Sequence, residues 1–131
     1  MQVKNIFISL FLVVVFFLTL SIKAEPTKIK KSISSNTVES LLLGLESDNF
    51  GLKTSSAFLL GELQVTSAVV PLMKMLRSSE SDEAKIVAAL ALYKLGTPMS
   101  IHALFQAARF EDSNRVKKMC SGFYRDFISK R

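Results

Sequence analysis

The 131-residue chain contains a single cysteine, Cys120. A lone cysteine excludes a disulfide within the chain, whereas an exported domain stabilised by disulfides would show an even number. The fold therefore depends on its hydrophobic core, in which a free cysteine usually behaves as a small apolar residue. We expect Cys120 to be buried in this way; the alternative is an intermolecular disulfide.

Histidine is equally scarce, with His102 as its only instance. One histidine and one cysteine on different elements form a nucleophile pair only if the fold happens to join them. A metal site needs several ligands at suitable spacing, and no such group occurs. Gly44, Gly51 and Gly61 fall at helix or turn positions rather than in a phosphate-binding loop. We predict a noncatalytic protein with no metal and no cofactor.

No stretch alternates apolar and polar residues with the period of two that indicates a half-buried strand. Apolar residues recur at helical spacing instead, and capping residues mark the boundaries. Asn36 and Thr66 are predicted N-caps, Thr97 and Pro98 open a further helix, and Gly96 ends one. The sequence therefore predicts an all-α fold of six helices in three antiparallel pairs, with helices at about 36–46, 51–64 and 114–129 among them.

One motif occurs three times with a period of 32 residues, measured between its lysines. The copies are Leu52-Lys53-x-x-Ser56-x-x-Leu59-Leu60-Gly61-Glu62-Leu63, then Ala84-Lys85-x-x-Ala88-x-x-Ala91-Leu92-Tyr93-Lys94-Leu95, then Val116-Lys117-x-x-Cys120-x-x-Phe123-Tyr124-Arg125-Asp126-Phe127. A fixed period of this length indicates units that cannot bury their apolar faces alone and stack on their neighbours.

At these residues the chain resembles the short bacterial HEAT-like repeats that also occur in phycobilin lyases. Their second helix reads approximately Val-Arg-x-x-Ala-x-x-Ala-Leu-Gly-x-Leu; the first copy matches it best, and the second has Tyr93 at the glycine position. The resemblance implies a short right-handed α-solenoid of three helix-turn-helix repeats, at about 36–64, 66–96 and 97–129 of a domain spanning 36–131. Such repeats serve scaffolds, adaptors and a few enzymes, so the resemblance implies little about function.

Residues 1–24 have the layout of a secretory signal peptide. An apolar run from Ile6 to Leu20 is followed by a cleavage position at Ala24 and a flexible polar leader, residues 25–35. The run is short for a membrane span, which takes about 20 residues. We expect an exported protein, periplasmic or secreted. The alternative is an uncleaved anchor through residues 6–22, which the lysines after the run would favour.

The formal net charge of +6 is modest, and removal of Lys4 and Lys23 with the signal would lower it by two. Much of the remainder lies near the two ends of the chain, whereas a nucleic-acid footprint gathers on one face. We therefore expect no nucleic-acid partner, and contact with a membrane only if the N-terminal segment is retained.

A basic residue opens the second helix of each repeat, and an aspartate lies in the turn before it. We expect these residues to form a structural ladder between repeats, with contact to an anionic ligand as the alternative; they are Lys53, Lys85, Lys117, Asp48, Asp82 and Asp112. Single exposed pairs of this kind contribute roughly 0–1 kcal/mol.

The outward positions of the second helices are unusually apolar. They include Ala57 and Ala89, and the largest side chains define a candidate partner-binding patch of Phe58, Ile86, Val87 and Leu90. An exposed apolar patch on a globular domain usually marks a binding surface. The alternative is that these side chains belong to the core.

The sequence thus predicts a noncatalytic, exported protein-binding scaffold or adaptor. One alternative is a membrane-anchored module that organises an envelope complex, and another is an accessory lyase-like subunit with a ligand pocket. The expected partner is a protein of unknown identity. Self-association through an end is a further expectation, because the terminal repeats lack polar caps.

Overall fold

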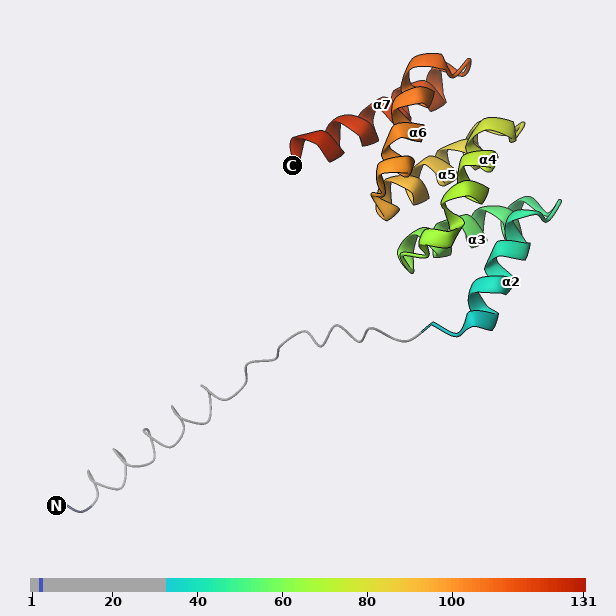
Figure 1. Cartoon of the computed structure of the whole chain (residues 1–131), viewed down its shortest axis with the longest axis vertical. Helices are drawn as coiled ribbons and strands as arrows, with labels where there is room; N and C mark the ends of the chain where they lie inside the picture. Colours follow the sequence, from blue (N-terminus) through green and yellow to red (C-terminus); the bar gives the residue numbers. More distant parts are fainter. Residues whose placement is uncertain (1–2, 4–32) are drawn as a thin grey trace. The chain divides into compact units, whose positions relative to one another are not determined.

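The computed structural model describes residue 3 and residues 33–131 (Figure 1). Between residues 33 and 131 the chain is helical and contains no strand, which confirms the all-α prediction. The elements are α2 (Ser35–Leu45), α3 (Phe50–Glu62), the short 3-10 helix η1 (Thr66–Ala68), α4 (Val69–Ser78), α5 (Asp82–Leu95), α6 (Pro98–Phe110) and α7 (Asn114–Ser129). The predicted signal peptide or anchor lies outside the described residues.

The second helix of each pair begins at a capping side chain, and these caps repeat with the period of the sequence motif. Asn49, Ser81 and Ser113 accept hydrogen bonds from the backbone N–H groups of Leu52, Ala84 and Val116. Each bond satisfies an N–H that the first helical turn leaves without a partner. The same cap chemistry at the same interval explains why three different sequences start a helix at equivalent points.

Two predicted caps are wrong. Asn36 lies inside α2, which begins one residue earlier because the Ser34 carbonyl already accepts from two backbone amides. Thr66 begins η1, and no side chain caps that element. Thr97 is confirmed as a cap, since its hydroxyl accepts from the Ser100 backbone N–H.

Two helix ends are closed by left-handed residues 32 positions apart. Gly96 follows α5 with φ 59°, as predicted, and Gln64 follows α3 with φ 56°. The side-chain amide of Gln64 donates to the carbonyl of Gly61 at 3.1 Å and to the carbonyl of Lys94 at 2.7 Å. These two bonds cap the ends of α3 and α5 together and offset the cost of a left-handed non-glycine residue.

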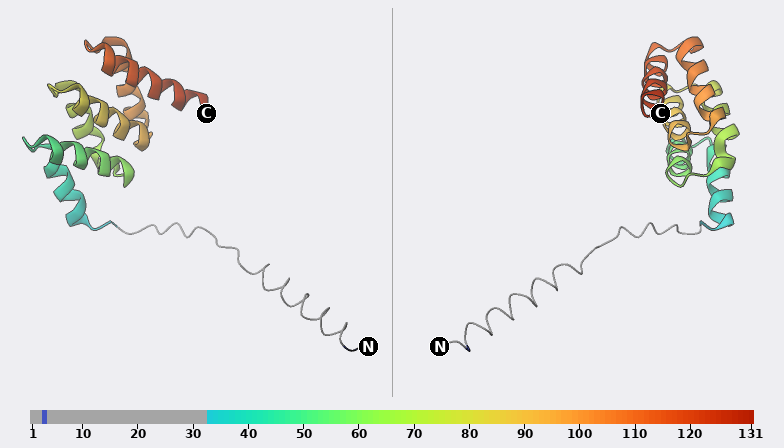
Figure 2. Two further views of the ribbon diagram at one scale, coloured as in Figure 1. Left: turned by 180° about the vertical axis from the view of Figure 1, so that it is seen from behind. Right: turned by 60° about the vertical axis from the view of Figure 1, so that its left-hand side comes forward.

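The helices form two layers (Figure 2). One layer holds α2, α4 and α6, and the other holds α3, α5 and α7. Within each pair the two helices pack on each other, and neighbouring pairs touch through α3–α5, α5–α7, α2–α4 and α4–α6. Short turns join the helices, which makes successive helices antiparallel neighbours.

The core lies between the layers and along the contacts of successive pairs. The column of Ser56, Ala88 and Cys120 is buried, with at most 2% exposure, as the repeat alignment predicts. The prediction that Ala57 and Ala89 point outward is wrong, since both are fully buried. Helix α5 packs against α3, α4, α6 and α7, and Glu83 is its only exposed residue.

Candidate functional site

The predicted binding patch lies on the layer of second helices, and its members differ in exposure. Phe58 on α3 is 43% exposed, whereas Ile86, Val87 and Leu90 on α5 are half-buried. Ile86 and Val87 pack partly against the core. The patch is therefore one exposed aromatic ring beside three side chains that show only part of their surface.

Helix α7 extends this apolar surface by one residue that the predicted patch omits. Met119 stands 32 positions after Val87 and is 38% exposed. Because α3, α5 and α7 lie side by side in one layer, these residues follow one face across three helices. We call Phe58, Ile86, Val87, Leu90 and Met119 the outer strip.

Charged side chains border the outer strip at α3 and α5. The Lys94 ammonium stands 5.4 Å from the centre of the Phe58 ring and pairs with Glu62. A cation over an aromatic face at this distance is an attractive contact. An apolar centre with a charged rim is the usual anatomy of a protein–protein interface.

A second polar group lies where α5 meets α7. Tyr93 stacks on Phe123 with ring centres 5.3 Å apart, and its hydroxyl donates to Asp126. Lys130 donates to the same carboxylate at 2.6 Å. The bond from Lys130 is the larger cause and the bond from Tyr93 the second, and together they hold the pKa of Asp126 below its usual range. The bond to Asp126 also raises the pKa of Lys130. The repeat pattern does not predict this group, although Tyr93 at a glycine position of the motif is the signal for it.

One exposed ion pair also joins α5 to α7. Arg115 pairs with Glu83, and hydrogen bonding to this guanidinium is the main reason that the pKa of Glu83 is lowered. The two residues are 32 positions apart, as are Glu62 and Lys94. Two ion pairs between residues 32 positions apart therefore link successive helix pairs.

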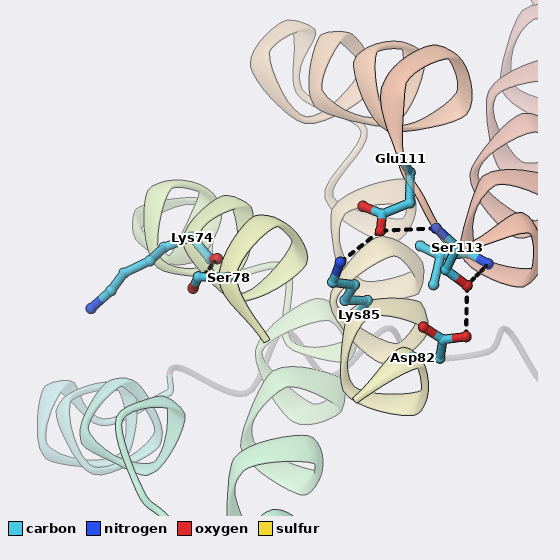
Figure 3. Close-up of polar contacts among 7 residues, drawn as sticks. Lys74, Ser78, Asp82, Lys85, Glu111 and Ser113 are labelled. Atoms are coloured by element: carbon cyan, nitrogen blue, oxygen red, sulfur yellow. Dashed lines mark hydrogen bonds and ion pairs between the residues drawn. The ribbon is translucent and has the colours of Figure 1, made fainter. Parts of the chain in front are cut away.

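The turns before α5 and α7 hold the most buried ion pair of the described residues (Figure 3). Lys85 approaches Glu111 at 2.6 Å, with side-chain exposures of 16% and 10%. Beside it, the Ser113 hydroxyl donates to Asp82 at 2.6 Å. Both contacts join the second helix pair to the third, so Lys85 and Asp82 have structural partners.

The remaining members of the predicted ladder make no ion pair within residues 33–131; they are Lys53, Lys117, Asp48 and Asp112. Lys85 itself pairs with a glutamate rather than an aspartate. Lys53 lacks the equivalent partner because the residue 32 positions before Glu111 is Ser79, whose side chain carries no charge. The predicted ladder is thus reduced to the contacts of Lys85 and Asp82.

Two surface hollows lie near these turns. One, of about 440 Å³, is lined by residues of the first two helix pairs, including Lys53, Lys74 and Glu46. The other, of about 540 Å³, lies between α4 and α6 and includes Arg77, His102 and Lys85. Since Lys85 is neutralised by Glu111, its amine is not a free cation for a ligand in the second hollow.

His102 and Cys120 occupy different environments. His102 is exposed on α6 beside Gln106, whereas Cys120 is fully buried on α7. Burial raises the pKa of the Cys120 thiol to about 11, and Glu111 adds to the effect. A thiol in this state is a poor nucleophile, because the thiolate is the reactive form. The burial of Cys120 confirms its predicted place in the core.

Among the residues that the structure describes, no group of histidine, cysteine and acidic side chains could hold a metal ion. None of the helices described is both long and apolar enough to cross a membrane. The chain matches no protein-family model, and no curated protein matches it significantly.

Proposed function

We propose that the chain is a noncatalytic protein-binding module, a scaffold or adaptor built as a short right-handed α-solenoid of three HEAT-like repeats. The observation that carries the proposal is the outer strip, an apolar surface that runs over three neighbouring helices around the exposed Phe58 ring. Aromatic anchors of this kind dominate the energetics of many protein interfaces.

Two features support the repeat architecture. First helices share one layer and second helices the other. Four of the contacts between successive pairs join residues 31 to 33 positions apart: Asp82 with Ser113, Glu62 with Lys94, Glu83 with Arg115 and Tyr93 with Asp126. A stack of equivalent units makes its contacts at the period of the repeat.

The test compares partner binding with stability on the same variants. Phe58→Ser and Met119→Ser remove partly exposed apolar surface, and we expect each to lose a co-purifying protein partner while the free energy of unfolding changes little. Val70→Ser is the matched control, because Val70 is 62% exposed on α4 in the other layer. If these variants keep the partner, or lose it only by unfolding, the outer strip is not the binding surface.

We also propose that the module is exported, with cleavage after Ala24 and a mature chain starting at Glu25. The support is the signal-like layout of residues 1–24. N-terminal sequencing of the protein recovered from cells separates this form from the anchored alternative. A chain that starts at Met1 and stays in the membrane fraction would establish the anchor through residues 6–22.

A further inference from the structure

The N-terminal end of the helix array exposes positions that the other helix pairs bury. In α5, Ala84 and Ala91 face the preceding pair and are 3% and 1% exposed. The residues 32 positions earlier on α3 are Leu52 and Leu59, which are 52% and 42% exposed. The first helix pair therefore presents two leucines in the place where the next pair has a buried contact.

The contacts of the later pairs show which way these leucines face. Ala91 lies against Gly61 of α3, and Phe123, a further 32 positions on, stacks on Tyr93 of α5. Leu59 holds the same position in the first pair, 32 residues before Ala91, and it therefore faces away from α5. We call the surface of Leu52 and Leu59 the N-terminal end face.

The opposite end of the array carries a charge at the position that would meet a further helix pair. The position of Tyr93, which stacks on Phe123 of α7, is taken in the last pair by Arg125. Arg125 is exposed. Stacking one chain head-to-tail on another would bury this charge against Leu59 without a partner, which is unfavourable. The two ends are therefore not complementary to each other.

The N-terminal end face is complementary to itself. Leu52 and Leu59 are seven residues apart on one face of α3, and the small, exposed Ser55 lies between them in the sequence. Residues 54–61 carry no charge, so two copies of this segment can approach without repulsion. Antiparallel packing about a two-fold axis near Ser55 places each Leu52 against the other copy's Leu59, as an isologous contact requires.

We propose that two copies of the chain associate through the N-terminal end face, with α3 of one copy packed antiparallel against α3 of the other. The dimer closes, because each copy uses its N-terminal end face and leaves the end that carries Arg125 free. The N-terminal end face adjoins the outer strip but has different residues, Leu52 and Leu59, and the proposal does not rest on the proposed function.

The test is the oligomeric state of the chain that starts at Glu25. Residues 32–131 form a separate compact unit with its own core, and removing the apolar run prevents it from associating on its own account. We expect sedimentation equilibrium to give a dimer, and Leu52→Glu with Leu59→Glu to give a monomer of unchanged helicity. The control Val70→Glu, on an apolar residue of α4 that is more exposed than either leucine, should remain dimeric.

A cysteine probe decides the matter if the glutamate variants fail to fold. Ser55→Cys places a thiol at the expected two-fold axis, and we expect mild oxidation to give a covalent dimer. Ser67→Cys, at an exposed residue of η1, should give none, and the buried native Cys120 should not react. A monomeric parent chain, a dimer that survives in the folded glutamate variants, or equal crosslinking at residues 55 and 67 would each overturn the proposal.

Discussion

Gly61 on α3 packs so closely on Ala91 of α5 that a Cβ atom at residue 61 would lie 2.8 Å from the Ala91 Cα atom. At the equivalent positions of the next contact, Tyr93 of α5 stacks on Phe123 of α7 with ring centres 5.3 Å apart. The same two repeat positions thus bring the backbones of α3 and α5 together, whereas between α5 and α7 they hold a pair of aromatic rings. The motif loses its glycine where the two helices meet through aromatic rings rather than through their backbones.

Gly61→Ala should destabilise the fold, because the added methyl group meets the α5 backbone rather than a movable side chain. Overpacking of this kind costs about 1–3 kcal/mol, which exceeds the gain of about 0.5–1 kcal/mol from replacing a mid-helix glycine. Denaturant unfolding measures the change.

The matched control is Gly122→Ala on α7, where an added Cβ would have no neighbour within 4 Å. This variant should be more stable than the parent by about 0.5–1 kcal/mol. Equal effects at residues 61 and 122 would contradict the close contact of Gly61 with Ala91.

Gln64 should contribute to stability through its side chain rather than its backbone. Gln64→Ala keeps a left-handed non-glycine residue and loses both bonds to helix ends, so we expect a loss of about 1–3 kcal/mol. Gln64→Gly loses the same bonds but relieves the strain at φ 56°, and should recover about 1 kcal/mol of that loss. Thermal or denaturant unfolding of the three proteins should rank them in the order glutamine, glycine, alanine.

Acid should weaken the contact between α5 and α7. Both Glu83 and Asp126 have lowered pKa values in the fold, owing to Arg115 and to Lys130 with Tyr93. Their contribution is complete above the ordinary carboxyl pKa of about 4 and is lost as the pH falls through the lower values of the folded state. Hydrogen exchange should then accelerate in α7 before it does in α3, and Asp126→Asn should reduce the pH dependence. Uniform acceleration in all helices would count against this local effect.

Cys120 should be unreactive in the folded protein. Its raised pKa of about 11 favours the neutral thiol, so this contribution to stability is present below the ordinary value of about 8.5 and declines as the pH rises above it. A thiol reagent at neutral pH should label the native chain far more slowly than the denatured chain. Rapid labelling of the folded protein would show that Cys120 is accessible.

The helix pairs are predictable from sequence because local signals agree with the repeat period. Asn49, Ser81 and Ser113 recur at 32-residue spacing and start helices by the same bond, and the buried column of Ser56, Ala88 and Cys120 keeps small side chains where helices meet. Periodicity and capping are short-range properties, and a single chain displays them directly.

The exposure of each side chain is less predictable because it depends on how many helices surround it. Ala89 occupies an outward position by helical spacing, yet neighbours on several sides bury it. The partner of Lys85 is likewise not predictable, since the choice between Asp82, Asp112 and Glu111 depends on the path of the turn between α6 and α7. Sequence spacing alone does not define that path.

The most direct test of the binding module is site-specific photo-crosslinking in the cells that produce the protein. A photoreactive residue at position 58 should give a discrete adduct with one protein, and Met119→Ser in the same chain should weaken that adduct. The same probe at position 70, exposed on α4 in the other layer, should give none. An absence of adduct at position 58, or the same adducts at both positions, would contradict a protein-binding role for the outer strip.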